Sequence, residues 1–162
     1  MISYRVIAIP EQIAQHVRAT LKSPQYGHPA HVEIASGYGP CRSCLQTFHT
    51  GEEQRILFTH NPFAGLADYP SPGPIFIHKE ECSTHTDSGF PLKLRELPLM
   101  LEAFGQGRAL IKQERVDKDN VDAAITRLLE NSAAEYLHVR NAEAGCYIAR
   151  VERVRRSAVH EF

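Results

Sequence analysis

Apolar residues recur along the chain at the two spacings that predict strands and helices. Residues 3–9 alternate and are rich in β-forming side chains, so they predict a first strand. Pro10 suits the first turn of a helix, and Ile13, Val17 and Leu21 follow at four-residue intervals. This spacing puts the three apolar side chains on one face and predicts a short amphipathic helix with a polar outer face.

A second helix is predicted over residues 120–131, where the acidic sequence DKDN precedes an apolar stripe. The members of the stripe recur at helical spacing: Val121, Ala124, Ile125, Leu128 and Leu129. A helix with one apolar face needs a partner surface, so we expect it to pack on a sheet.

Extended segments account for most of the rest of the chain. Further strands are predicted over residues 31–35, 41–49, 55–60, 75–78, 109–116, 136–141 and 146–154. The turn signals TGEE and AEAG join two pairs of these strands into antiparallel hairpins. Residues 92–104 are apolar but interrupted by Pro98, which favours irregular or briefly helical structure, and residues 63–74 read as a surface loop.

These elements predict an α+β fold, with a mainly antiparallel sheet and about two helices packed on one face. A length of 162 residues suits one compact domain, so we expect residues 1–162 to form a single domain. Hydrophobic residues make up 43% of the chain and charged residues 23%, which is the composition of a globular protein rather than a disordered one.

Charge and targeting signals exclude several classes of partner. A formal net charge of -1 argues against the broad basic surface that nucleic-acid binding requires. The first seventeen residues lack the pattern of a signal peptide, and no apolar stretch has the length of a membrane span. We therefore expect a cytoplasmic protein whose four cysteines are reduced, and predict neither nucleic acid nor membrane as a partner.

Cysteine spacing raises a metal site as one alternative. Cys41 and Cys44 form a C-x2-C pair, and Cys82 and His85 form a C-x2-H pair about forty residues later. Thiolates and imidazole in this number are a ligand set that tetrahedral zinc accepts. Convergence on one ion requires the backbone to turn tightly between Cys41 and Cys44.

The predicted strand over residues 41–49 argues against that turn. Side chains of a strand point to alternate faces, so Cys41 and Cys44 would project from opposite sides of the sheet. The sequence has no glycine between them, and LQTFHTGE is a poor helix for a thioredoxin-like redox pair. The favoured interpretation is therefore that the thiols pack as small apolar groups and that no cofactor is bound, with zinc as the alternative.

The same alternation groups four cationic or titratable side chains. If the strands are neighbours, Arg42, His78, His138 and Arg140 gather on the sheet face that the helices leave uncovered. Guanidinium and imidazole groups bind oxyanions, so this face is a candidate site for a small anionic ligand. The competing interpretation is an open sheet whose polar face simply lies in water.

Several short blocks, in order, resemble a known family. They are GPCRSCL, Gly51–Glu52, Asn61–Phe63, Tyr69, Gly73–His78, Cys82 and HVRNAEAGCYIARVE, from about Tyr38 to Val154. The chain resembles the bacterial family known as domain of unknown function 1203. The resemblance implies a small bacterial protein in which cysteine followed by arginine, here Cys41 and Arg42, is typical, whereas the position of Cys44 need not be cysteine. It implies no activity.

Three functional classes remain open on the sequence alone. They are a protein that binds a small anion on the Arg and His face, a zinc-stabilised module, and a protein-interaction domain with no small-molecule site. The third would use an exposed apolar patch, for which LPLMLEAF at residues 97–104 is the candidate, although core packing is the favoured fate of that segment. The sequence names no substrate, and it decides neither enzymatic activity nor oligomeric state.

Overall fold

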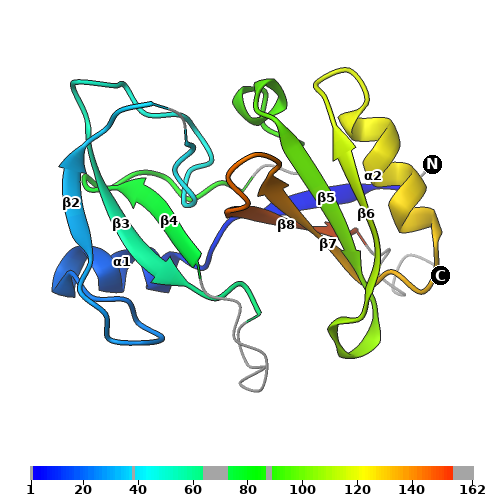
Figure 1. The fold of residues 1–162 in the computed structure, drawn as a ribbon, viewed down its shortest axis with the longest axis horizontal. Coiled ribbons are helices and arrows are strands. Elements are labelled where there is room, and N and C mark those ends of the chain that lie inside the picture. The colour runs from blue at the N-terminus through cyan, green and yellow to red at the C-terminus, as the bar shows by residue number, and fades with distance from the viewer. Residues whose placement is uncertain (1, 38, 64–72, 87–88, 155–162) are drawn as a thin grey trace, which may run out of the picture.

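Two antiparallel sheets, each packed against one helix, make up the described part of the chain (Figure 1). The computed structural model describes residues 2–37, 39–63, 73–86 and 89–154. In chain order the elements are β1 (Tyr4–Ile7), α1 (Glu11–Thr20), β2 (His31–Ile34), β3 (Gln54–His60), β4 (Gly73–His78), η1 (Lys93–Glu96), β5 (Leu99–Phe104), η2 (Gln106–Arg108), β6 (Leu110–Val116), α2 (Val121–Glu130), β7 (Tyr136–Asn141) and β8 (Tyr147–Arg153). The predicted surface loop over residues 63–74 falls largely outside the described residues.

The larger sheet has five strands in the order β1-β8-β7-β5-β6, and every neighbouring pair is antiparallel. Helix α2 covers one face of this sheet with its apolar stripe, which is buried as the sequence predicts. Beneath the helix lie Leu99 and Leu101 of β5 and Leu137 and Val139 of β7. Their alternation follows the two-residue period of a strand, so every second side chain enters this core.

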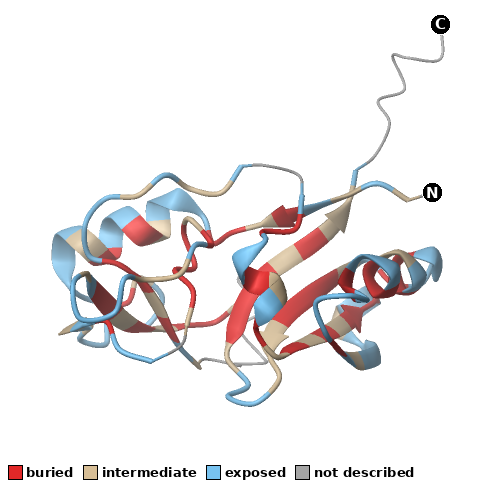
Figure 2. Ribbon diagram, turned by 90° about the horizontal axis from the view of Figure 1, so that it is seen from above, coloured by how far each residue is buried: buried red, intermediate tan, exposed pale blue. Residues whose placement is uncertain are grey.

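The smaller sheet has three antiparallel strands in the order β2-β3-β4. Helix α1 packs on it through Ala14 and Val17, which share a second apolar core with Ile56 of β3 and with Ile75 and Ile77 of β4. Buried positions occur in both sheets and in the segments that join them (Figure 2). The smaller core has few members, so other interactions must help to hold this part of the molecule.

The face of the larger sheet opposite α2 is covered in part. Phe63 packs on His138, His60 of β3 packs on Tyr147 of β8, and β4 contacts β8. His138 is 0% exposed. The predicted alternation along β7 is correct, but solvent does not reach the face at His138, because Phe63 packs on this residue and the smaller sheet packs on the adjacent Tyr147.

The α+β class with antiparallel sheet is confirmed. The strands form two sheets rather than one, and each sheet carries one helix. The β7–β8 hairpin is confirmed, whereas residues 41–49 are not a strand. The sequence pattern favours irregular structure around Pro98, but residues 99–104 form the strand β5. Pro98 lies just before this strand and therefore removes none of its hydrogen bonds.

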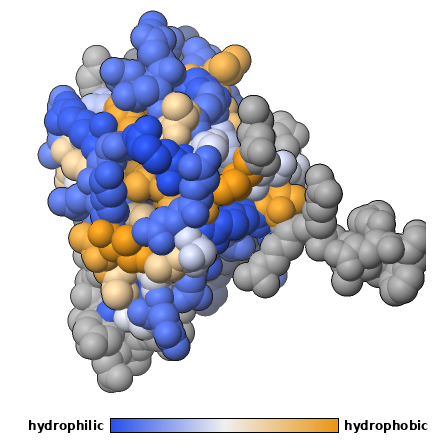
Figure 3. Space-filling view, turned by 90° about the vertical axis from the view of Figure 1, so that its right-hand side faces the viewer, coloured by the Kyte–Doolittle hydropathy of each residue, from blue (hydrophilic) through white to orange (hydrophobic). Residues whose placement is uncertain are grey.

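Within the described residues, neither α1 nor α2 combines the length and the apolar character needed to cross a membrane. The side of the molecule that carries α2 is mainly hydrophilic, with apolar patches between the polar side chains (Figure 3). The segment LPLMLEAF contributes little to these surface patches, because four of its apolar residues are buried: Leu97, Leu99, Leu101 and Phe104. Core packing is therefore its role.

Substitution of Leu101 tests that role. Leu101 is 0% exposed at the centre of the larger sheet, whereas Leu110 of β6 is 50% exposed. Leu101→Ala should lower the free energy of unfolding by about 2–5 kcal/mol because it leaves a cavity. Leu110→Ala, the matched control, should change it by about 0.5 kcal/mol or less. Urea unfolding measures both, and equal effects would contradict the assignment of this segment to the core.

Candidate metal centre

A tight turn brings the first two cysteines together. The N–H of Leu45 donates to the carbonyl of Cys41 at 2.8 Å, and the N–H of Cys41 donates to the carbonyl of Gln46 at 2.8 Å. We call residues 41–45 the knuckle. The predicted strand over residues 41–49 is wrong, because a backbone closed by these bonds cannot be extended, and both sulfur atoms now lie on the same side.

Leu45 makes the knuckle possible without glycine. Its φ of 61° lies in the left-handed region, which costs an ordinary L-residue roughly 1–2 kcal/mol. The Leu45 side chain is fully buried in the core of the larger sheet, and burial of a leucine contributes about 1.5–3 kcal/mol. Tertiary packing of Leu45 therefore offsets the strain of its left-handed backbone, a conformation that the sequence pattern does not predict.

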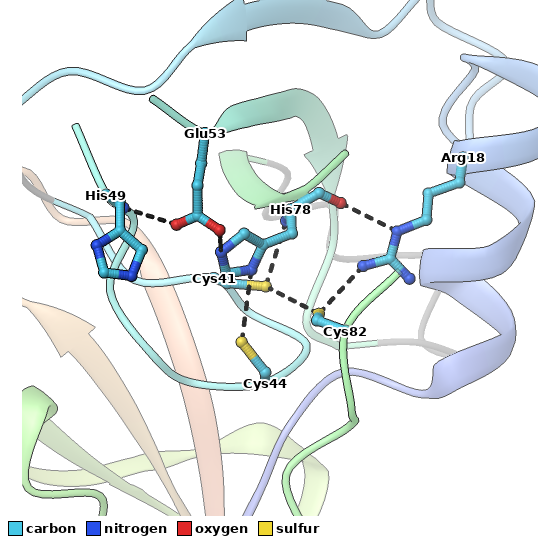
Figure 4. A network of polar contacts seen from close by, with 7 residues as sticks. All are labelled: Arg18, Cys41, Cys44, His49, Glu53, His78 and Cys82. Atoms are coloured by element: carbon cyan, nitrogen blue, oxygen red, sulfur yellow. Dashed lines mark hydrogen bonds and ion pairs between the residues drawn. The ribbon is translucent and has the colours of Figure 1, made fainter. Parts of the chain in front are cut away.

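Four side chains form the candidate centre, two from the knuckle and two from the end of β4 and the segment after it: Cys41, Cys44, His78 and Cys82. Their ligand atoms all lie within 4.8 Å of one another. Cys41 Sγ and Cys82 Sγ are 3.7 Å apart, and Cys44 Sγ is 3.5 Å from His78 Nδ1 (Figure 4). A disulfide would need about 2.05 Å between sulfur atoms, so these are free thiols.

These separations match the edges of a metal-centred tetrahedron. With metal–sulfur bonds of about 2.3 Å and metal–nitrogen bonds of about 2.0–2.1 Å, tetrahedral geometry separates two sulfur ligands by about 3.8 Å. The same geometry separates a sulfur and a nitrogen ligand by about 3.6 Å. One S–S and one S–N separation thus suit a single ion of the size of zinc, and all four ligand atoms lie within 4.8 Å of one another.

The structure brings together three of the four sequence-predicted ligands and replaces the fourth. Cys41, Cys44 and Cys82 converge, but the histidine is His78 at the end of β4 and not His85. The backbone of His85 is anchored beside the knuckle, where its N–H donates to the carbonyl of Ser43 at 2.9 Å, yet its ring is outside the cluster. The sequence feature that could have identified His78 as a ligand is its H-x3-C spacing with Cys82.

Glu53 fixes the orientation of the histidine. Its Oε2 lies 3.2 Å from His78 Nε2, while Nδ1 of the same ring faces the sulfur atoms. The other carboxylate oxygen accepts the backbone N–H of His49 at 2.7 Å. Carboxylates in this position hold a metal-binding imidazole in the correct rotation and tautomer. No motif in the sequence pointed to Glu53.

Donors to sulfur offset the negative charge that the thiolates would carry. Arg18 of α1 donates through Nη2 to Cys82 Sγ at 3.2 Å and through Nε to the carbonyl of His78 at 3.0 Å. The backbone N–H of His78 donates to Cys41 Sγ at 3.3 Å. Hydrogen bonds with Cys41 and Cys44 hold the pKa of Cys82 well below its usual value, whereas those with Cys41 and Cys82 raise the pKa of Cys44, so the thiolate that the cluster favours is that of Cys82.

The other three residues of the predicted anion face lie around Tyr147 of β8. Arg42 donates from Nε to the carbonyl of Tyr147, the ring of His138 packs against the Tyr147 ring, and Arg140 is its partner in the β7–β8 register. His78, the fourth, points into the thiol cluster instead. The face is an interior junction between the two sheets.

Arg42 is the cation at the centre of this junction. It is 1% exposed and donates to the carbonyls of Tyr147 and Pro40, both at 2.7 Å. It forms no ion pair with a carboxylate among the described residues. Burial lowers its pKa, and the neighbouring Cys146 opposes that shift. Arg42 therefore joins the knuckle to β8 at the cost of an uncompensated buried charge.

His138 is equally enclosed. Rings of four residues surround it: Phe63, Phe104, Tyr136 and Tyr147. Within the described part of the chain, neither of its ring nitrogens has a hydrogen-bond partner. Burial lowers its pKa to about 3, and the positive charges of Arg140 and Arg150 add to the shift. The ring is therefore neutral at pH 7.

Comparisons with known proteins identify a family but no function. A family model described as "Protein of unknown function (DUF1203)" matches residues 38–153. No curated protein and no solved structure matches the chain. The matched range contains all four residues of the candidate centre.

The buried His138 should make stability depend on pH. The unfolded chain binds a proton near the ordinary pKa of 6.5, but the folded chain does so only near 3. The stabilisation is therefore complete above pH 6.5 and lost as the pH falls toward 3. Between pH 7 and pH 5, His138 should account for a loss of about 2 kcal/mol.

Urea unfolding of the wild type and His138→Leu at both pH values measures this contribution. Leucine fills similar space and does not titrate, so the difference between the two proteins cancels the titration of other groups. The loss between pH 7 and pH 5 should be smaller in the variant by about 2 kcal/mol. An identical pH dependence would refute the neutral buried imidazole.

Proposed function

Because the chain belongs to the DUF1203 family, whose members are proteins of unknown function, we propose a function from the geometry of the site alone. The protein binds one zinc ion as a structural centre. The ligands are the thiolates of Cys41, Cys44 and Cys82 and the Nδ1 atom of His78. The observation that carries this proposal is the spacing of 3.7 Å between two sulfur atoms and 3.5 Å between sulfur and nitrogen.

The donor set favours zinc over harder cations. Thiolate and imidazole are the ligands of structural zinc sites, whereas magnesium and calcium take oxygen ligands. Each of the four side chains offers one ligand atom, so a tetrahedral ion would have no open position for a substrate. A closed set of this kind supports a structural role and not Lewis-acid catalysis.

The position of the centre explains what such an ion would stabilise. The knuckle, the end of β4 and the segment after it meet there, and Arg18 of α1 donates to one of its sulfur atoms. The smaller sheet and α1 share only a small apolar core. An ion that ties these segments together would supply free energy of folding that the core cannot.

The charge and redox state of the ligands set the conditions of this proposal. Three thiolates and one neutral imidazole around Zn²⁺ leave a net charge of about −1, which Arg18 and the N–H donor to Cys41 Sγ offset. Three reduced thiols require a reducing compartment, so the proposal places the protein in the cytoplasm.

Elemental analysis and thiol counting of the purified protein test the zinc centre. We expect about one zinc per chain. One thiol, that of Cys146, should react with a thiol reagent in the native protein, and all four should react after chelation. Chelation should lower Tm by about 10 °C, since loss of an ion worth several kcal/mol shifts Tm by this amount.

Matched variants separate the centre from ordinary thiols and imidazoles. Cys82→Ser and His78→Gln should lose the zinc, whereas Cys146→Ser and His85→Ala should keep it. The proposal would be overturned if the purified protein contained no zinc and its Tm did not change when a chelator was added. Retention of zinc by His78→Gln together with its loss from His85→Ala would also overturn the proposal. The histidine ligand would then be His85, as the sequence spacing suggests.

A further inference from the structure

A second candidate site lies between the two sheets, apart from the metal centre. It is a cavity of about 410 Å³. The end of β3 and the start of β4 form one wall, and the β7–β8 hairpin forms the other. His60, Arg140, Cys146 and Tyr147 contribute its polar or reactive side chains, and Ile75 contributes an apolar one. Volumes of this order accommodate small organic molecules.

His60 provides an unused hydrogen-bonding group at the cavity. It is 5% exposed, and its Nδ1 atom has no hydrogen-bond partner among the described residues. Burial lowers its pKa to about 4, with a smaller effect from the charge of Arg42. An unpaired buried nitrogen lowers the stability of the fold. His60 lines the cavity, so a small rotation of its ring would present this nitrogen to a ligand there and let the two pair.

The charges around the cavity favour an anion. Arg140 is held by Glu102, which accepts from its Nε, and by the carbonyl of Gly145 at 3.1 Å from Nη1. That pair is neutral overall. Behind the wall, Arg42 has no carboxylate partner among the described residues, and its guanidinium donates to the carbonyls of Tyr147 and Pro40. The junction therefore carries one uncompensated positive charge.

We propose that this cavity binds a small organic monocarboxylate. Its carboxylate meets His60 and Arg140, and its apolar body lies against Ile75 and Tyr147. The proposal keeps Arg140 from the sequence-predicted anion face, and it replaces His78 by His60, because His78 points at the thiols. Arg42 and His138 act from behind Tyr147 and do not touch the ligand. The zinc proposal is not required for it.

Alkylation of Cys146 provides a local readout, because its half-exposed thiol lines the cavity. The full chain is treated with iodoacetamide, and peptide mapping follows Cys146 alone. Benzoate at millimolar concentration should slow this reaction about tenfold at saturation. Benzamide, which has the same shape without the charge, should bind at least about tenfold more weakly, since it lacks a charge-assisted hydrogen bond.

Variants of the cavity residues test whether the benzoate that protects Cys146 is bound in this cavity. His60→Phe and Arg140→Met should each weaken the benzoate effect by about tenfold or more. Their controls, His31→Phe and Arg127→Met, change exposed residues elsewhere and should leave it intact. Should a cavity variant fail to fold, Ala144→Trp supplies the test, because Ala144 is an exposed residue of the hairpin at the cavity wall. The larger side chain should abolish protection without altering either core.

Three results would overturn the proposal. One is the absence of benzoate protection at 10-fold higher concentration than in the first assay, about tens of millimolar. Another is equal protection by benzamide, which would mean that the charge is not recognised. The third is protection by inorganic phosphate and not by benzoate, which would assign an inorganic anion to the cavity. Loss of zinc in the same protein would not change these readings, because mapping reports Cys146 separately from the centre's three thiols.

Discussion

The knuckle at residues 41–45 is the constraint on which the arrangement of both sheets depends. Cys41 belongs to the apolar core of the smaller sheet, and Leu45, four residues later, belongs to the core of the larger one. Between them, Arg42 reaches back to β8, and the carbonyl of Ser43 accepts the N–H of His85. Five consecutive residues thus link two cores and two further segments. A straight strand could not make these contacts.

The metal centre and the buried arginine stabilise this junction in different ways. The four candidate ligands tie the knuckle to β4 and to the segment that follows it. Arg42 ties the same knuckle to β8, through backbone carbonyls that accept from a charged donor. Hydrogen bonds to a charged group contribute more than neutral ones, but burial of the charge opposes them. The zinc ion would act on the weaker side of the junction, where the apolar core is small.

Local sequence patterns predicted what local interactions decide. The stripe of α2, the β7–β8 hairpin and the α+β class all follow from residues a few positions apart, and the structure confirms them. The knuckle did not follow, since the left-handed residue is Leu45 and not glycine, and its strain is offset by a distant core. Packing between segments far apart in sequence decides the backbone conformation of Leu45. The local spacing of hydrophobic residues does not indicate it.

The choice of ligand shows the same limit. Spacing after Cys82 suggested His85, but spacing alone does not say which of two nearby histidines has its ring at the sulfur atoms. His78 holds that place because β4 ends there and because Glu53 turns its ring, and Glu53 itself lies in a turn before β3. The alternation along β7 was read correctly, yet Phe63 and the second sheet cover part of the face it defined, which makes His138 an interior residue.

The two proposed sites therefore rest on separate physical grounds. One is a closed set of soft ligands whose spacing suits a single ion and leaves no position for chemistry. The other is a cavity with an unpaired imidazole nitrogen and an uncompensated positive charge behind its wall. Arg42 connects them, because it follows the first ligand directly in the chain and donates to the carbonyl of Tyr147, a residue that lines the cavity. The hydrogen bonds of Arg42 to the carbonyls of Tyr147 and Pro40 hold that charge behind the cavity whether or not an ion occupies the centre.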